Sequence, residues 1–482
     1  MQFNSLYFIL YFLPVVMLGW YLLNKKSGKA ADVFLLAASF LFYFAGGWYL
    51  PLFLASLILV NWALCLVMRK KPGKKTPLVL GICINAGLLL YFKYTNFFLE
   101  NLNTLLKTDL ALRNIVLPLG ISFIAFTQIS FLVDSYRGET KEVSFLDFAL
   151  YSAFFPKITQ GPITRQKDLI PQFQDQRSRI FDADGVASGL QMFTLGLAKK
   201  VFLADTFGNY LTTFFELKGS SNSLEAAVAI LAYSLQIYFD FSGYSDMALG
   251  SAKMLGFDLP ANFNSPYKAD SVTDFWRRWH ISLTDFLREY IYFPLGGSRK
   301  GTARTYVNIL IVFLVSGFWH GANWTFIVWG VVHGLLQVFE RANRKWYFKI
   351  PHIIRQVFMF VAVSILWMVF RCDTFLDFAH VMRLLFSGTW NGGLRSELAD
   401  TLSIPGLRSV LSVLHLPYTD YGAQLLSVAL LLVFSLFLVF VPENAEKRRY
   451  RTTAGSLLLT LALFAASILS LSSVSSFIYN NF

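Results

Sequence analysis

A histidine lies at the centre of a strongly apolar stretch of this chain. His320 stands between Gly317 and Gly321, and apolar arms at about residues 306–318 and 324–339 flank it. A titratable ring between two membrane helices is costly unless it faces protein or a water-filled path, so the default interpretation is functional. Histidine also gives and takes protons near neutral pH. We therefore predict that His320 is the working group of a membrane enzyme; the alternative is a core histidine bonded to a carbonyl.

The neighbours of His320 suit such a site. Trp319, Asn323 and Trp324 form an amphipathic wall that carries hydrogen-bond donors. The flanking glycines let backbone or ligand approach closely. His333, on the second arm, is expected to pack between helices rather than to react.

A second polar segment precedes this hairpin, at residues 271–290. At helical spacing Trp276, His280 and Leu283 share a face. His280 offers a second polar ring near the cytoplasmic side of the membrane. The alternative for this segment is an interfacial helix that is anchored by its Trp and Arg side chains.

Several residues are candidates for the path of a substrate. Arg277 and Arg278, with Arg299 and Lys300, are expected to hold a phosphate-bearing donor such as coenzyme A. Asp240 and Asp246 end an apolar run, and buried acids persist when they are paired or orient another polar group. Either acid is expected to fix a histidine tautomer or to pair with an arginine, in a structural role. The complete set of predicted path residues is Trp276, Arg277, Arg278, Trp279, Trp319, Asn323, Asp240 and Asp246.

Composition places the chain in a lipid bilayer. Of its 482 residues 55% are hydrophobic and 15% charged, and the mean hydropathy is +0.51, a combination rare in soluble proteins. The apolar runs are continuous, which indicates helices rather than a membrane barrel. The net charge of +13 resides in short loops, as membrane orientation requires, so nucleic acid is not an expected partner. The three cysteines predict neither a disulfide framework nor a metal site, and no bound cofactor is expected.

Basic loops define the expected topology. Clusters at residues 25–29, 69–75, 299–304 and 341–349, Arg137 and Lys141, and the run from Lys447 to Arg451 are assigned to the cytoplasm. Both termini are then outside, and His320 lies at the apex of a hairpin toward the outer half of the membrane. We predict ten or eleven spans in an all-α, multi-pass protein of the cell membrane. The expected spans are about 3–23, 31–47, 51–68, 77–94, 115–134, 224–239, 306–318, 324–339, 353–370, 422–441 and 454–472.

Three segments are expected to depart from simple spans. Residues 154–165 hold two prolines and a glycine, and such broken backbone survives at membrane depth only where protein or water covers it. Residues 178–218 predict an interfacial amphipathic helix, and residues 372–420 an outside segment with short helices. The whole chain, 1–482, is interpreted as one integral membrane domain. Its parts are N-terminal helices (1–150), a catalytic core (150–340) and C-terminal helices (341–482).

Four motifs in order give the chain a family resemblance. The motifs are Phe154-Phe-Pro with Gly161-Pro-Ile, Asp240-Phe-Ser-Gly-Tyr-Ser-Asp246, Phe275-Trp-Arg-Arg-Trp-His-Ile-Ser282 and Gly317-Phe-Trp-His-Gly-Ala-Asn-Trp-Thr-Phe326. With them, between about residues 150 and 340, the chain resembles the membrane-bound O-acyltransferase family, and most closely the bacterial alginate O-acetyltransferase branch. The opening, residues 8–14, is also similar.

The resemblance implies both a fold and an activity. It implies many helices around a funnel or tunnel, with His320 matching the family's essential histidine and His280 its second tunnel histidine. Members move an acyl group from a cytoplasmic thioester to a hydroxyl at the outer face, and alginate-type members work with an exported SGNH-like acetyltransferase. Such transfer needs a base and donors for the oxyanion. His320 would be the base or a transient acyl acceptor, and Asn323, Trp319 or a backbone N–H would be the donor.

The expected activity is transfer of acetyl from cytoplasmic acetyl-CoA to an exported polysaccharide or cell-wall glycan. Within the same class, the alternative is D-alanyl transfer from a carrier protein toward teichoic acid. A glycan transporter, in which His320 would line a route without chemistry, and an assembly scaffold are the alternatives from other classes.

Overall fold

The computed structural model describes residues 1–140, 143–217, 221–444, 446, 450, 452–471 and 475–478. Within them every regular element is a helix and no strand occurs, which confirms the all-α class. Part of the predicted orientation rests on basic residues outside the described ones: Lys141, Lys447, Arg448, Arg449 and Arg451.

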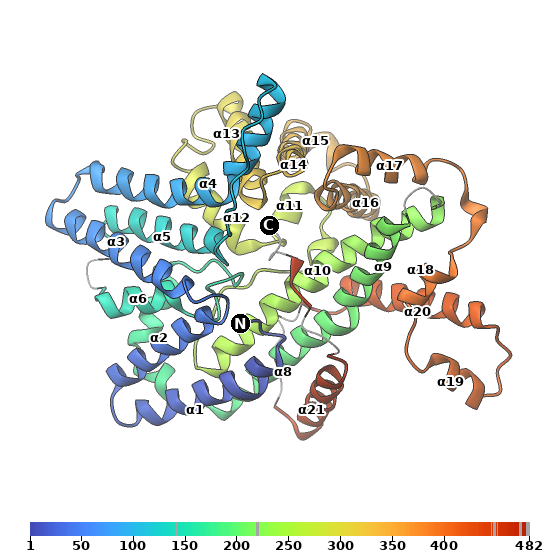
Figure 1. Cartoon of the computed structure of the whole chain (residues 1–482), viewed down its shortest axis with the longest axis horizontal. Helices are drawn as coiled ribbons and strands as arrows, with labels where there is room; N and C mark the ends of the chain where they lie inside the picture. Colours follow the sequence, from blue (N-terminus) through green and yellow to red (C-terminus); the bar gives the residue numbers. More distant parts are fainter. Residues whose placement is uncertain are drawn as a thin grey trace.

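The helices follow one another with short connections (Figure 1). The α-helices of the first half are α1 (Leu13–Asn24), α2 (Gly28–Phe44), α3 (Leu50–Lys70), α4 (Lys75–Leu106), α5 (Ile121–Tyr136), α6 (Phe145–Ala153), α7 (Gln166–Gln174), α8 (Ala183–Ala198), α9 (Asp205–Glu216) and α10 (Ser223–Met254). Those of the second half are α11 (Val272–Trp276), α12 (Ile281–Leu287), α13 (Thr302–His320), α14 (Trp324–Ala342), α15 (Arg344–Tyr347), α16 (His352–Arg371), α17 (Phe375–Leu385), α18 (Ser396–Thr401), α19 (Leu407–Val413), α20 (Asp420–Phe440) and α21 (Ala454–Leu469). The π-helical turns are η1 (Phe8–Phe12), η3 (Lys199–Ala204) and η5 (Arg288–Tyr292), and the 3₁₀ turns are η2 (Gln176–Arg179), η4 (Pro266–Lys268) and η6 (Trp390–Gly392).

Membrane character is clearest in six of these helices. The described residues contain six that are long and apolar enough to cross a bilayer: α3, α4, α10, α13, α16 and α20. Shorter apolar helices lie at Phe8–Asn24, Ile121–Tyr136 and Ala454–Leu469. The protein is therefore a multi-pass membrane protein, and the count of ten or eleven spans stays a prediction.

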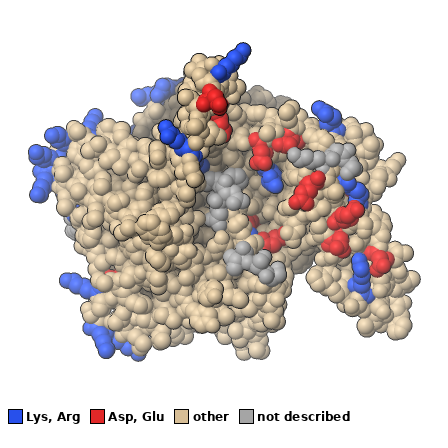
Figure 2. Space-filling view, viewed as in Figure 1, with Lys and Arg blue, Asp and Glu red and all other residues tan. Residues whose placement is uncertain are grey.

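Charged side chains are unevenly distributed over the face drawn in Figure 2. Lys and Arg gather toward the left edge, where Figure 1 draws the ends of α1 to α4. Asp and Glu gather toward the right, where Figure 1 draws α17 to α20. Such a separation is consistent with basic loops on the cytoplasmic side and the 372–420 segment on the other.

Helix α10 is the central element of the fold. In the most apolar stretch of α10, 72% of the residues are buried inside the protein, whereas in α4 the share is 17%. Helix α10 is therefore surrounded by protein, and α4 lies at the periphery. The run of α8, η3 and α9 lies antiparallel along α10, with Gly196 against Gly243 and Gly189 against Gly250. Small residues allow two backbones to approach this closely.

This packing shows what residues 178–218 lie against. One face of the helical run covers α10, and its predicted position at the membrane interface stays a prediction. Its charged residues include Lys200, which is 2% exposed and points inward.

The broken stretch at residues 154–165 is covered by protein, as predicted. Phe154, Phe155 and Ile158 are at most 3% exposed. The Tyr151 hydroxyl donates to the Thr164 carbonyl over 2.9 Å, which ties the end of α6 to the end of this stretch. The stretch therefore lies between helices as an irregular, buried layer.

The segment at 372–420 contains short helices, as predicted. It is fastened to the start of α10 by Arg395, whose guanidinium Nε donates to the Glu225 carboxylate over 2.9 Å. Ser223 Oγ donates to the Leu384 carbonyl over 2.8 Å. Its location outside the membrane stays a prediction.

The α13–α14 hairpin depends on two glycines, and this gives a first prediction. A Cβ at Gly317 would lie 2.4 Å from the Phe326 carbonyl oxygen, and one at Gly330 2.4 Å from that of Phe313. Gly317→Ala is therefore expected to force the two helices apart and to cost about 1–3 kcal/mol, as overpacking does. The measurement is the thermal unfolding midpoint in detergent. Gly87→Ala, in α4 with no atom within 4 Å, is the matched control; an equal loss in both variants would contradict this account.

Candidate functional site

The orientation of the His320 ring is determined by its own helix. Its Nδ1 lies 2.7 Å from the Ser316 carbonyl oxygen, one turn earlier in α13. A carbonyl can only accept, so Nδ1 is the donor and carries the hydrogen. In the neutral ring Nε2 then carries the lone pair, which is the tautomer that a general base needs.

His320 borders a cavity rather than a dry core. The ring is 3% exposed, and a cavity of about 290 Å³ reaches it. Val116, on the cavity rim, is 63% exposed, so the cavity extends to the surface of the protein. Its lining joins elements far apart in sequence: Gly46, Tyr49, Leu50, Lys93, Val116, Leu117, Pro118, Leu119, Gly120, Ile121, Ser122, Phe123, Thr159, Gln160, Trp319 and His320. A substrate hydroxyl can therefore approach the histidine from outside the protein.

Trp319 offers a hydrogen-bond donor at the same cavity. Its indole is 5% exposed, and its Nε1 has no acceptor among the described residues. The ring is held by Phe123 and Phe126, each at 5.3 Å between centroids. A buried N–H without a partner costs free energy, and such groups are found where a ligand or water completes the bond. Trp319 is therefore the predicted oxyanion donor that the geometry favours.

Trp319→Phe gives a second prediction. The change keeps the aromatic ring but removes the N–H, and loss of one oxyanion donor lowers kcat by about 10²–10³-fold. The check is the steady-state rate of acyl transfer by folded, reconstituted protein. Trp48→Phe, at a 70% exposed indole, should leave the rate unchanged. A kcat for Trp319→Phe within twofold of the wild type would remove Trp319 from the site.

His280 lies behind Trp319 and is fully buried. The Trp319 ring is 6.0 Å from His280 and 4.9 Å from His320 between centroids, so it lies close to both histidines. His280 Nδ1 is 3.3 Å from Asn262 Oδ1, which also accepts from Ser282 Oγ over 2.6 Å. His280 has a φ of 44°, a left-handed conformation that is rare for a bulky residue and persists only where its surroundings enforce it.

Glu446 supports the Asn262 backbone beneath His280. Its carboxylate accepts from the backbone N–H of Asn262 and of Phe263, the latter over 2.9 Å. Burial, and after it the charge of nearby Asp246, raises the pKa of the Glu446 carboxyl to about 8. Glu446 thus fixes the loop that holds Asn262 beneath His280.

The predicted shared face of residues 276–283 is wrong. Helix α11 ends at Trp276, and the left-handed residue His280 starts α12 in a new direction. Trp276 contacts His333 of α14 instead, and its Nε1 donates to His333 Nδ1 over 3.4 Å. His333 is packed among aromatic rings, as predicted, with Trp329 at 4.9 Å.

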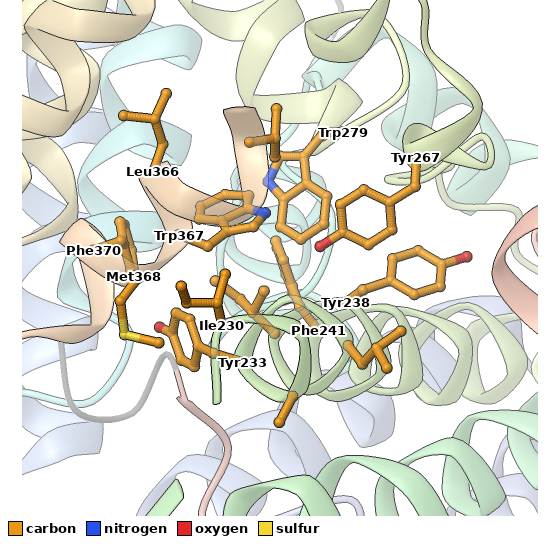
Figure 3. Close-up of a cluster of buried hydrophobic side chains, with 14 of the residues drawn as sticks. Ile230, Tyr233, Tyr238, Phe241, Tyr267, Trp279, Leu366, Trp367, Met368 and Phe370 are labelled. Carbon is orange, nitrogen blue, oxygen red and sulfur yellow. The ribbon is translucent and has the colours of Figure 1, made fainter. Parts of the chain in front are cut away.

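The predicted path residues Arg277, Arg278 and Trp279 lie in three different environments. Arg277 is exposed, whereas Arg278 donates to Asp274 over 2.8 Å. Trp279 is 1% exposed and lies in the hydrophobic cluster of Figure 3, with the Trp367 ring at 4.7 Å and Tyr267 beside it. Arg277 therefore remains the accessible cation of the pair, and Trp279 is a core residue.

Asp240 and Asp246 pair with lysines, which corrects the predicted histidine or arginine partner. Lys200 Nζ is 2.7 Å from Asp240, and Lys199 Nζ is 2.6 Å from Asp246. The π-helical turn η3 at Lys199–Ala204 presents these two consecutive lysines to α10. The structural role predicted for both acids agrees with these contacts.

Asn323 is occupied at the hairpin turn. Its Oδ1 accepts from the Thr325 backbone N–H over 3.1 Å, which caps α14, and its Nδ2 donates to the Asp373 carbonyl over 2.7 Å. This amide therefore fixes the corner between α13 and α14. It is less suited than Trp319 to serve as an oxyanion donor.

Three residues that contact the two histidines were not predicted from the sequence: Ser316, Asn262 and Lys93. Ser316 acts through its carbonyl and Asn262 through a contact distant in sequence, so neither carried a signal. Lys93 did carry one, because it is an ionisable residue in an apolar run. Its Nζ lies 2.7 Å and 2.8 Å from the carbonyl oxygens of Trp319 and His320.

Comparison with known proteins places these residues in context. Residues 35–374 match the model of the MBOAT, membrane-bound O-acyltransferase family. The chain is 38% identical to the peptidoglycan O-acetyltransferase of Helicobacter pylori over 415 residues, which cover 79% of either chain. It is 40% identical to the probable alginate O-acetylase of Azotobacter vinelandii, over 81% of this chain and 79% of the other. Similarity to the teichoic acid D-alanyltransferase of Streptococcus thermophilus is lower, at 29% over 45% of this chain and 55% of the other.

Proposed function

The chain belongs to the membrane-bound O-acyltransferase family and is an acyltransferase of the bacterial plasma membrane, and we propose that it transfers acetyl from cytoplasmic acetyl-CoA. The acceptor is a hydroxyl of an exported polysaccharide or cell-wall glycan. The acetyl group reaches it through an exported SGNH-like partner. His320 is the catalytic base.

The observation that carries this proposal is the pairing of a fixed tautomer with an accessible cavity. Nδ1 of His320 is bound by Ser316, and the ring borders the 290 Å³ cavity. Nε2 takes the proton from an entering hydroxyl while that oxygen attacks the thioester carbonyl carbon. Trp319 Nε1 donates to the oxyanion of the tetrahedral intermediate. As the intermediate collapses, the carbon–sulfur bond breaks, the departing thiolate takes the proton from Nε2, and an acetyl ester and a free thiol remain.

Acetyl is favoured over D-alanyl as the transferred group. The O-acetyltransferase relatives are 38–40% identical over about four fifths of the chain, whereas the D-alanyltransferase is 29% identical over less than half. Both groups are carried on thioesters and leave by the same chemistry at His320. The difference therefore lies in the donor that docks on the cytoplasmic side, for which Arg277 is a candidate contact.

The test is a transfer assay with wild-type protein in proteoliposomes. Labelled acetyl-CoA and a D-alanyl carrier protein are supplied in parallel on the cytoplasmic side, with a soluble glycan and an SGNH-like partner on the other. We expect label from acetyl-CoA to reach the acceptor side and none from the D-alanyl carrier. Label from the D-alanyl carrier alone would replace the acetyl assignment. No label from either donor would favour a transporter or a scaffold.

A further inference from the structure

The end of α13, which carries His320, is followed by an extended residue rather than by the helical or turn residue that caps many helices. Gly321 follows in an extended conformation, and within the described residues no backbone N–H bonds to the last carbonyls of this helix. Neighbouring helices are capped: the Asn343 N–H bonds to Phe339 after α14, and the Cys372 N–H to Met368 after α16. Carbonyls left without a donor at a buried helix end are costly. The catalytic turn therefore needs a donor from elsewhere.

Helix α4 supplies that donor. The Lys93 ammonium donates to the carbonyl oxygens of Trp319 and His320, over 2.7 Å and 2.8 Å. The next residue, Tyr94, stacks on Phe318 at 4.5 Å with the ring planes 8° apart. Two successive residues of α4 thus hold three successive residues of α13. A cation is also the group that the negative end of a helix dipole attracts.

We propose that Lys93 is a positioning residue for His320. It borders the same cavity as the histidine, and its ammonium donates to the carbonyls of both residues 319 and 320. The Ser316 carbonyl that orients the imidazole lies in the same helical turn, so fixing this turn fixes the ring. The inference rests on the proposed function and adds to it the group that maintains the geometry of the base and of Trp319.

The size of the effect follows from the sensitivity of catalysis to geometry. A displacement of about 1 Å at a reacting group can lower a rate by about 10²-fold. Lys93→Met removes both bonds and the charge but retains most of the side-chain length. We expect kcat to fall at least tenfold, with the KM for acetyl-CoA unchanged within threefold, because Lys93 holds the base and not the donor. Lys93→Arg, which keeps a charged donor, is expected to restore kcat to within about threefold of the wild type.

Lys268 provides a matched control. Its Nζ lies 3.3 Å from the carbonyl oxygens of Val441 and Pro442, which makes it a lysine cap at the end of α20, away from the His320 cavity. Lys268→Met removes the same kind of contact and should leave kcat unchanged. Thermal unfolding midpoints of both variants are measured beside the kinetics, with rates expressed per folded protein. If Lys93→Met does not fold, Lys93→Gln takes its place with the same expected fall, because its uncharged side chain is one bond shorter than lysine and does not reach both carbonyls.

The outcomes separate the two proposals. A fall in kcat for Lys93→Met, its recovery in Lys93→Arg and an unchanged Lys268→Met would support positioning by Lys93. Equal kcat in Lys93→Met and the wild type, or equal losses in the Lys93 and Lys268 variants, would overturn it. Absence of acetyl transfer by the wild type would contradict the proposed function instead.

Discussion

Replacing His320 by alanine is expected to abolish acyl transfer while leaving the protein folded and inserted. The ring donates a hydrogen bond of 2.7 Å to its own helix and borders a cavity. Alanine removes its ring contacts with Trp319, Trp329 and Phe370 but leaves the glycine contacts between α13 and α14 in place. Loss of a general base lowers a rate by about 10²–10⁴-fold. We expect the upper end of that range, since His320 both takes the hydroxyl proton and returns it to the thiolate. The measurement is single-turnover transfer of labelled acetyl in proteoliposomes.

The control for this experiment is another histidine. His352 has a 62% exposed side chain at the start of α16, so His352→Ala should transfer acetyl at the wild-type rate. Residual activity above a few per cent in His320→Ala, with an unchanged unfolding midpoint, would mean that another group acts as the base. His280 would then be the next histidine to replace, since its ring contacts Phe123 and Trp319, which both line the cavity.

Removing Lys200 should have the largest effect on stability. Its Nζ lies 2.7 Å from Asp240 and 2.8 Å from Asp205 and also donates to the Ser476 carbonyl over 3.0 Å. Lys200→Met would leave the Asp240 carboxylate buried with the Ile478 backbone N–H as its remaining donor. Breaking a buried pair from one side costs about 3–5 kcal/mol. We expect a large drop in the thermal unfolding midpoint and a reduced yield of folded protein.

The two members of the Lys200–Asp240 pair differ in the partners that remain when the other is replaced. Asp240→Asn should cost less than Lys200→Met, because Lys200 would keep its contact with Asp205. An exposed pair provides the control: Lys253 and Asp258 lie 3.4 Å apart with side chains 36% and 82% exposed. Lys253→Met should leave the midpoint unchanged, because exposed pairs contribute little. A Lys200→Met midpoint equal to that of Lys253→Met would show that the buried pair is not needed for stability.

The sequence determined the class of protein and predicted the reacting residue. Continuous apolar runs can be satisfied in lipid only as helices, because each backbone group must be bonded within its own segment. For the same reason the cost of placing an imidazole in an apolar hairpin predicted a functional role for His320. Proline and glycine in residues 154–165 predicted an irregular, protein-covered stretch, and the described structure contains it.

Tertiary structure alone decided which groups contact the predicted site residues. Helical periodicity assumed one continuous helix from Trp276 to Leu283, but the left-handed conformation of His280 breaks it. The partners of Asp240 and Asp246 depend on a π-helical turn some 40 residues earlier, and one residue of register decides which lysine faces which acid.

The lysine that donates to the carbonyls of Trp319 and His320 is still more distant in sequence. Lys93 is 227 residues from His320 in sequence, and nothing in either segment encodes their contact. The spacing of apolar residues within one helix shows which of its faces will be buried, because that spacing can be read for each helix separately. Which polar groups then meet is decided only when helices distant in sequence pack side by side, since hydrogen bonds act over about 3 Å and require both partners in place.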